Sequence, residues 1–412
     1  MDPALRPEDA EFRRRAIDFV AAHWPPEGRT QRWLLAQSAP ADYLRLPSVQ
    51  HWQQALVEQR WSVPHWPQRF GGQPFSPTQR VIWDRECTLA MTPRSAEFAI
   101  ERLGPVLHEW GSPAQCEHHL SAIREFRAHW HCPSAQALYP PQVQALATGE
   151  GYVLNGTVDL PAALRRSAPN WCVIVATQPA TAQPTTANDQ GSAPLLLLVE
   201  LTGPGIAIEP VQRANVAPNS SQYARGARVR LVDLTVEAEA RLGSAQDTAA
   251  IWECLWEPAR RDPTRVARNR VFLDRLRELA QGVVVGSATL WDDADFSHQL
   301  RILEIAQQGQ EVLEQRLLQT DDPVVNRALE AMLALAGNES ALEIQHLVRG
   351  ALGYDLLPDP DPLLLANEGP IGHEYAVMAM QGMLGDGTAT PGLSATQVQR
   401  YKEIIAKSAL TL

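Results

Sequence analysis

Near the middle of the chain stands Gly149-Glu150-Gly151-Tyr152-Val153-Leu154-Asn155-Gly156. Its Tyr, Val and Leu are typical of a strand, and Asn155-Gly156 is a dipeptide typical of a two-residue hairpin turn. On its N-terminal side the apolar residues recur at helical spacing, and on its C-terminal side short β-like runs follow one another. We therefore expect a β segment inside an otherwise helical chain.

The sequence before this stretch predicts helices. Apolar residues recur every three or four positions from Glu11 to Ala22 and from Val49 to Gln59. Two helix starts, Ser76-Pro77-Thr78-Gln79 and Gly111-Ser112-Pro113, combine a capping Ser with Pro in the first turn. This pattern stops near Cys132, where several prolines interrupt the chain. Residues 1–131 are therefore predicted to form an N-terminal helical domain.

The sequence after the stretch predicts strands and then helices again. Further β-like runs occupy Trp171–Thr177, Leu195–Thr202, Ile206–Val211 and Arg228–Val236. Helical spacing returns from about Ala245 and persists almost to the end. We therefore expect a β domain at 132–243, a helical bundle at 244–412 and an α+β fold with separate layers. This order excludes alternating β-α-β folds.

Composition narrows the classes of function. The chain has 412 residues and a net charge of −11, which argues against binding nucleic acid over its surface as a whole. Five cysteines without short spacing indicate neither a disulfide framework nor a zinc site, so no metal is expected. No signal peptide and no apolar stretch of the roughly 20 residues that span a membrane is found. We expect a cytoplasmic protein.

Four segments of the chain resemble the acyl-CoA dehydrogenase family. Trp61–Gly72 is similar to its "W-x-x-P-x-W-P-x-x-[FY]-G-G" segment, and Leu103-Gly104-Pro105 with Gly111–Gln115 is similar to "L-G-P…G-T-x-E-Q". The stretch at 149–156 is similar to "G-x-G-Y-V-[LV]-N-G", and Gln397-Val398-Gln399-Arg400 to "[EQ]-I-Q-R". The resemblance spans about residues 10–410. It implies an N-terminal helical domain, a middle β-barrel-like domain and a C-terminal helical bundle.

The resemblance also implies a chemistry. In this family a carboxylate removes the α-proton of an acyl-CoA thioester while the β-hydrogen leaves as hydride to FAD. It implies an acyl-CoA substrate, association into a dimer or tetramer with itself or a second subunit, and an electron-transfer flavoprotein as partner. The bacterial branch that the chain resembles most includes enzymes for bulky thioesters such as sterol side chains, which suggests a role in steroid degradation.

Glu257 is the candidate catalytic base. Leu255-Trp256-Glu257-Pro258 follows the β segment where some branches carry "L-x-x-E-R". A nearby low-dielectric wall of tryptophan would raise the pKa of such a carboxyl. In the alternative interpretation Glu257 is a solvated carboxylate at a helix end, paired with Arg260 or Arg261. Glu253, one turn earlier, is the second candidate.

Three residues are candidates for binding FAD. Ser134 is the hydroxyl left in Cys132–Pro141, where the family has "S-E-P-x-A-G-S-D". Gln299 lies in Phe296-Ser297-His298-Gln299, which loosely resembles "F-G…H-Q". Arg270 belongs to an arginine cluster that could meet phosphates through bidentate bonds. The alternatives are a plain loop for Ser134, a polar helix face for Gln299, and pairing with Asp262 and Asp274 for the arginines.

The chain also departs from the family pattern. Leu160, Pro161 and Ala162 stand where the family has the flavin-contacting "W-[TS]-[SN]", and Leu393 stands where some branches carry the base. The combined absence of these family residues favours the interpretation that the chain is one subunit of a heteromeric, FAD-dependent acyl-CoA dehydrogenase. The alternatives are a self-sufficient enzyme, a non-catalytic subunit that completes a partner's flavin site, and a helical scaffold without ligand.

Overall fold

The chain folds into two compact units. A computed structural model describes residues 5–24, 46–93, 98–131, 142–160, 169–178, 194–212, 225–256, 265–282, 284–285, 287–320, 322–352 and 395–410. One unit, here the helical unit, comprises Met1–Trp33, Phe75–Arg94 and Pro258–Leu412. The other, here the sheet unit, comprises Leu34–Pro74 and Ser95–Glu257. The units cut across the three predicted domains, whose boundaries stay a prediction.

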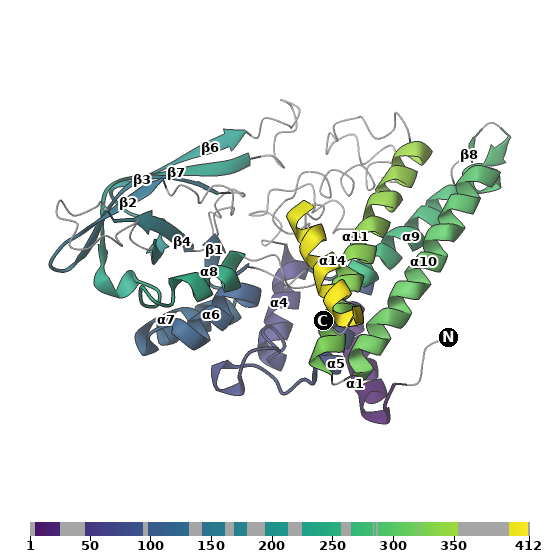
Figure 1. Cartoon of the computed structure of the whole chain (residues 1–412), viewed down its shortest axis with the longest axis horizontal. Helices are drawn as coiled ribbons and strands as arrows, with labels where there is room; N and C mark the ends of the chain where they lie inside the picture. Colours follow the sequence, from purple (N-terminus) through teal and green to yellow (C-terminus); the bar gives the residue numbers. More distant parts are fainter. Residues whose placement is uncertain are drawn as a thin grey trace. The chain divides into compact units, whose positions relative to one another are not determined.

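The helical unit joins elements from both ends of the chain (Figure 1). Its helix α10 packs on α9 and α11, α11 packs on α14, and α1 packs on α5. A short hairpin of β8 and β9 links α9 to α10. The bounds are α1 Pro7–His23, α5 Pro77–Leu89, α9 Arg265–Gly282, β8 Val284–Val285, β9 Ala288–Thr289, α10 Ala294–Gln319, α11 Pro323–Leu352 and α14 Ala395–Leu410.

The sheet unit combines short helices with the described strands of the main sheet. Its helices are α4 Pro47–Gln59, the π-helix η2 Ala99–Leu103, α6 Gly104–Trp110, α7 Pro113–Arg124 and α8 Thr248–Trp256. Its strands are β1 His129–His131, β2 Val143–Ala147, β3 Gly151–Leu160, β4 Asn170–Thr177, β5 Leu195–Glu200, β6 Ile206–Gln212 and β7 Arg225–Glu237.

Both predicted helix starts are confirmed. Ser76 caps α5 and Ser112 caps α7, and in each case the third residue of the helix is a Gln whose side chain accepts from the capping residue's N–H. Each capping box satisfies two backbone donors that a helix start would otherwise leave unpaired. Four residues of local sequence are therefore sufficient to set where these helices begin.

The described strands form one open, mixed sheet in the order β1-β4-β2-β3-β7-β6, with β5 on β4. Strands β1 and β2 both run parallel to β4, while the other pairs are antiparallel. The predicted order of helices, β segment and helices is confirmed. The barrel-like closure is not, because no pairing joins β5 to β6 among the described strands.

The predicted hairpin turn at Asn155-Gly156 is wrong. These residues lie inside β3, and the turn between β2 and β3 is made by Thr148–Gly151, where Thr148 N–H donates to the Gly151 carbonyl at 2.8 Å. Gly156 has φ +144° at a register shift, and a Cβ there would lie 2.1 Å from the Gln142 carbonyl oxygen. The glycine therefore serves a bulge rather than a turn.

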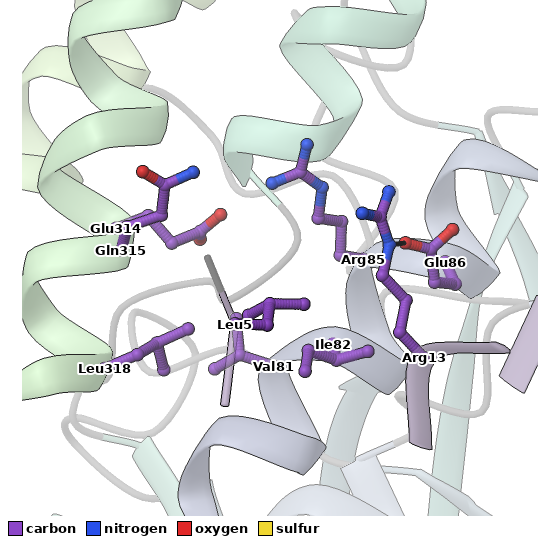
Figure 2. A pocket seen from close by; sticks show the side chains of 9 residues that line it. All are labelled: Leu5, Arg13, Val81, Ile82, Arg85, Glu86, Glu314, Gln315 and Leu318. Carbon is purple, nitrogen blue, oxygen red and sulfur yellow. Dashed lines mark hydrogen bonds and ion pairs between the residues drawn. The ribbon is translucent and has the colours of Figure 1, made fainter. Parts of the chain in front are cut away.

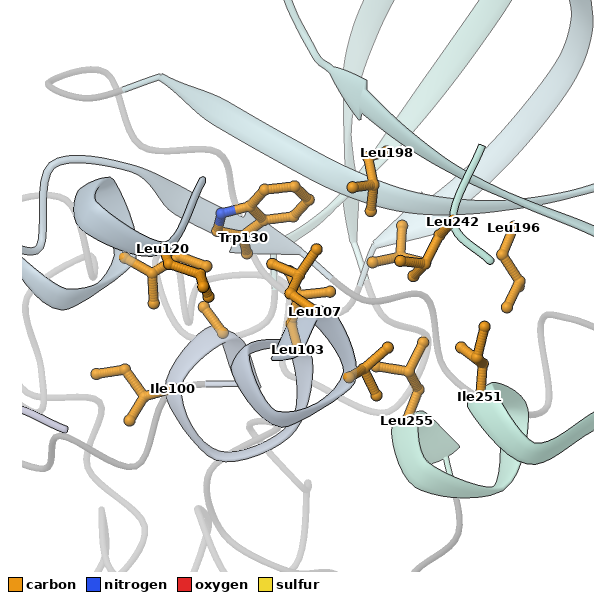
Figure 3. Packing of buried hydrophobic residues seen from close by; sticks show 14 of the residues in the cluster. Ile100, Leu103, Leu107, Leu120, Trp130, Leu196, Leu198, Leu242, Ile251 and Leu255 are labelled. Atoms are coloured by element: carbon orange, nitrogen blue, oxygen red, sulfur yellow. The ribbon is translucent and has the colours of Figure 1, made fainter. Parts of the chain in front are cut away.

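Strands β4 and β5 carry the core of the sheet unit because both of their faces are buried. One face packs against η2, α6, α7 and α8 (Figure 3). The other face packs against the remaining strands. This explains the near-continuous apolar runs at Trp171–Thr177 and Leu195–Glu200, since a strand buried on both faces has no polar side to alternate.

Candidate functional site

Strand β1 ends just before the predicted flavin loop. A cluster of tryptophan and histidine rings packs at that end of the strand. Trp130 stacks on Trp171 at 5.4 Å between ring centroids, and the His119 ring lies 5.0 Å from Trp130 and 4.7 Å from Trp171. Burial, followed by the neighbouring His118, lowers the pKa of His119 to about 4. The imidazole is therefore neutral at pH 7. Ser134, the predicted flavin contact, lies outside the described residues.

Two of the family-like segments contact each other beside this cluster. His65 Nε2 and Trp66 Nε1 each lie 3.0 Å from the Ile100 carbonyl oxygen, within the π-helix η2. A Cβ on Gly104 would lie 2.2 Å from the Trp66 ring. The tryptophan of one segment therefore requires the glycine of the other, which is a physical reason for the two to occur together.

The end of α8 is anchored by an arginine that the sequence did not single out. The guanidinium of Arg102, on η2, donates to the Leu255 carbonyl at 2.8 Å. Leu255 is 1% exposed and belongs to the core in Figure 3. Glu257, the candidate base, follows two residues later and lies outside the described residues. No local pattern could reveal Arg102, because its partner is 153 residues away.

Arg270 lies on α9 and binds a carboxylate of the helical unit. Its Nε and Nη2 donate to the two carboxylate oxygens of Glu311 at 3.0 and 3.1 Å, and Asp274 lies 3.8 Å from Nη1. The hydrogen bonds to Glu311 raise the pKa of Arg270 further. Burial acts to raise the pKa of Glu311, but the bonds from Arg270 and Gln307 outweigh it and lower that pKa. The pair is therefore ionised at neutral pH.

Gln299 lies in the second turn of α10 and is exposed. Its amide is accessible to a ligand or to another chain. The predicted roles of Ser134, Gln299, Arg270 and Glu257 stay predictions, since only Gln299 and Arg270 lie within the described residues.

The described residues do not fit a complete FAD site. Leu160, which the motif resemblance matches to the family's flavin-contacting tryptophan, is 3% exposed and packs in the core of the sheet. Its side chain offers neither an aromatic face nor a hydrogen bond. Arg270 already forms a bidentate pair with Glu311. The donors that would hold a flavin must come from elsewhere, either from another chain or from segments outside the described ranges.

A pocket in the helical unit lies between α1, α5 and α10 (Figure 2). Arg13 Nε donates to Glu86 at 2.7 Å on one side, and Glu314 and Arg85 also line it. None of the predicted site residues lines this pocket. Within the described ranges, no group of three or more His, Cys, Asp or Glu could hold a metal ion, and no helix is long and apolar enough to cross a membrane.

Comparison with known sequences gives one partial match. No family model matches the chain. Acyl-CoA dehydrogenase IpdE1 of Mycobacterium tuberculosis is 29% identical over 167 residues, which are 39% of this chain and 41% of the relative. The match thus spans about two fifths of that relative's length.

Comparison with solved structures covers the whole chain. The ChsE4-ChsE5 complex from Mycobacterium tuberculosis matches with a TM-score of 0.69 and 18% identity over 100% of this chain and 99% of the other. The Tcur3481-Tcur3483 steroid ACAD (acyl-CoA dehydrogenase) matches with a TM-score of 0.69 and 14% identity over the same shares. The chain therefore has the fold of acyl-CoA dehydrogenases, a class of oxidoreductases. The resemblance indicated by its motifs is confirmed, and its similarities include the bacterial, steroid-type enzymes formed by two different chains.

Proposed function

We propose that this chain is one subunit of a heteromeric, FAD-dependent acyl-CoA dehydrogenase that acts on a bulky, steroid-type thioester. The observation that carries the proposal is a disagreement between fold and site. The acyl-CoA dehydrogenase fold extends over the whole chain, yet Leu160, which the motif resemblance matches to the flavin-contacting tryptophan, is buried in the sheet. A partner chain that supplies the missing contacts reconciles the two.

Glu257 is the proposed base for the α-proton. Arg102 supports this assignment, because it holds the last turn of α8 in place through the Leu255 carbonyl, two residues before Glu257. Proton abstraction requires a base held near one position, and a fixed end of α8 is consistent with that requirement. The electron acceptor that we propose is an electron-transfer flavoprotein, and the complex would work in the cytoplasm.

Co-expression tests the heteromeric proposal. We expect the chain produced alone to be colourless, and the complex with the product of a neighbouring acyl-CoA dehydrogenase-like gene to be yellow and active. The measurements are the visible spectrum and dehydrogenation of a steroid acyl-CoA. A yellow, active single chain would show a self-sufficient enzyme instead, and a colourless complex would remove the proposal.

A variant of Glu257 separates a catalytic subunit from a structural one. In the active complex, Glu257→Gln should lower kcat at least about a hundredfold while the flavin spectrum stays unchanged, because the amide cannot accept the proton. Glu253→Gln, one turn earlier, tests the second candidate base, and loss of activity in that variant alone would move the assignment to Glu253. Unchanged turnover in both Glu257→Gln and Glu253→Gln would favour the alternative, in which this chain only completes the partner's flavin site.

A further inference from the structure

Strand β3 contains a chemically labile peptide, Asn155-Gly156, which is the sole Asn-Gly dipeptide of the sequence. In such a dipeptide the backbone nitrogen of the glycine can attack the side-chain amide carbon of the asparagine, because glycine has no Cβ to hinder the approach. A bond forms between that nitrogen and Cγ, the bond from Cγ to the amide nitrogen breaks, and ammonia leaves. Water then opens the succinimide to aspartate or isoaspartate. The chain can therefore be modified here without an enzyme.

The bulge in β3 fixes the glycine of this dipeptide. Gly156 has φ +144°, and a Cβ there would lie 2.1 Å from the Gln142 carbonyl oxygen, so a larger residue does not fit. Asn155 is exposed and lies at the register shift between β3 and β7. Neither Asn155 nor Asp233 has a partner in the β3–β7 register. The fold therefore keeps the labile dipeptide, and its asparagine faces the irregular part of β7.

Asn155 and Asp233 bind each other through two hydrogen bonds. The Asp233 backbone N–H donates to Asn155 Oδ1 at 2.9 Å, and Asn155 Nδ2 donates to Asp233 Oδ1 at 2.9 Å. Asp233 has φ +48°, a left-handed conformation that aspartate tolerates better than most residues. Both ends of the carboxamide are thus bound across to β7, the strand beside β3 in Figure 1. Ring closure needs Cγ to approach the next nitrogen of its own strand, so these bonds must open first.

The product of the reaction would not fit this arrangement. A carboxylate at position 155 cannot donate to Asp233, and two like charges would then face each other across the strands. Isoaspartate also adds one carbon to the backbone of β3, which disturbs its register against β7. Modification at this position should therefore weaken the pairing of the two strands.

We propose that Asn155 is a deamidation site of this chain and that Asp233 controls its rate by binding the carboxamide across to β7. The inference goes beyond the proposed function and is independent of it, because neither residue is a candidate for binding flavin or substrate.

Peptide mapping by mass spectrometry, with an isoaspartate methylation assay, tests the proposal on the full chain in mildly alkaline buffer. Asn155 should deamidate at least about tenfold more slowly in the folded chain than in concentrated urea. Asp233→Gly removes the carboxylate but tolerates a positive φ, and it should raise the folded-state rate at least about threefold. Asp233→Asn keeps an acceptor oxygen and should stay as slow as the unaltered chain. Circular dichroism checks that each variant is folded.

The matched control is another ion pair between the same two strands. Arg228 on β7 donates to both carboxylate oxygens of Asp159 on β3, at 2.7 and 2.8 Å. Arg228→Ala removes this pair and should leave the rate at Asn155 unchanged. Equal rates in the folded and unfolded chain, an unchanged rate in Asp233→Gly, or the same acceleration in Arg228→Ala would overturn the proposal.

An exchange of the two side chains tests the effect of the product. Asn155→Asp should lower the urea midpoint of the sheet unit, because it places two carboxylates opposite each other. The chain that carries both Asn155→Asp and Asp233→Asn should regain most of the loss, since the pair re-forms with donor and acceptor exchanged. A midpoint unchanged by Asn155→Asp, or a double variant without recovery, would contradict the proposed pairing. Flavin content and turnover are not read, so failure here leaves the functional proposal standing.

Discussion

His119 and His108 are two imidazoles that the fold keeps neutral. Burial, followed by His118, lowers the pKa of His119 to about 4. Burial, followed by His65 and Arg69, lowers the pKa of His108 to about 4. His108 Nε2 is buried and has no hydrogen-bond partner among the described residues. Both rings pack on aromatic side chains of the sheet unit, so both act there as neutral core residues.

These shifts predict how stability depends on pH. In the unfolded chain each imidazole takes up a proton near its ordinary pKa of about 6.5, while in the folded chain it stays neutral until about pH 4. The stabilisation is therefore complete above about pH 6.5 and is lost as the pH falls towards 4. We expect the urea midpoint of the sheet unit, followed by tryptophan fluorescence, to fall between pH 7 and 5.

Phenylalanine variants test the assignment. His119→Phe keeps a ring against Trp130 and Trp171 but removes the titration, so the slope of unfolding free energy against pH should become shallower. His108→Phe should do the same, and the variant with both changes should have the smallest slope. Equal slopes in all four proteins would show that these imidazoles are not the groups that titrate.

Arg270 on α9 and Glu311 on α10 form an ion pair between the two helices. Both side chains are largely shielded, at 24% and 18% exposure, and they form two hydrogen bonds. Arg270→Ala and Glu311→Ala should each lower the free energy of unfolding by about 1–3 kcal/mol, because each leaves a charge without its partner. The protein with both changes should lose less than the sum, and urea unfolding measures each value.

The matched control is an exposed pair on the same helix. Arg275 and Glu278 are 41% and 65% exposed, so Arg275→Ala should lower stability by no more than about 0.5 kcal/mol. Additive effects of Arg270→Ala and Glu311→Ala would show that these two side chains do not stabilise the protein as a pair. Flavin content of the Arg270→Ala complex tests its other predicted role, since loss of flavin with unchanged stability would point to the cofactor rather than to α10.

Strands show which elements local sequence can predict. β3, β4, β5, β6 and β7 were all expected, because their apolar and β-branched runs are long. β1 and β2 were not, since three and five residues carry little pattern and their pairing with β4 depends on distant residues. Gly156 was assigned to a turn because Asn-Gly is a common turn dipeptide, but the approach of the Gln142 carbonyl decides its role.

For the assembled molecule, the number of FAD molecules per chain shows whether this chain has a flavin site of its own. If this chain lacks a flavin site of its own but completes a partner's, the co-expressed complex should carry roughly one FAD for every two chains. The ratio of flavin absorbance to protein measures this directly. A full complement of one FAD per chain would mean that segments outside the described ranges compensate for Leu160.

Local patterns were enough for the helix starts at Ser76 and Ser112, the long strands and the helix–sheet–helix order, because capping and burial periodicity act over a few neighbouring residues. The four family-like segments were equally visible, and Trp66 against Gly104 shows why two of them occur together. The open sheet, the Arg102 bond to the end of α8, the Arg270–Glu311 pair and the Asn155–Asp233 pair were not visible. Each depends on residues far apart in the chain, and only packing in three dimensions decides which side of a helix is buried and which charge meets which.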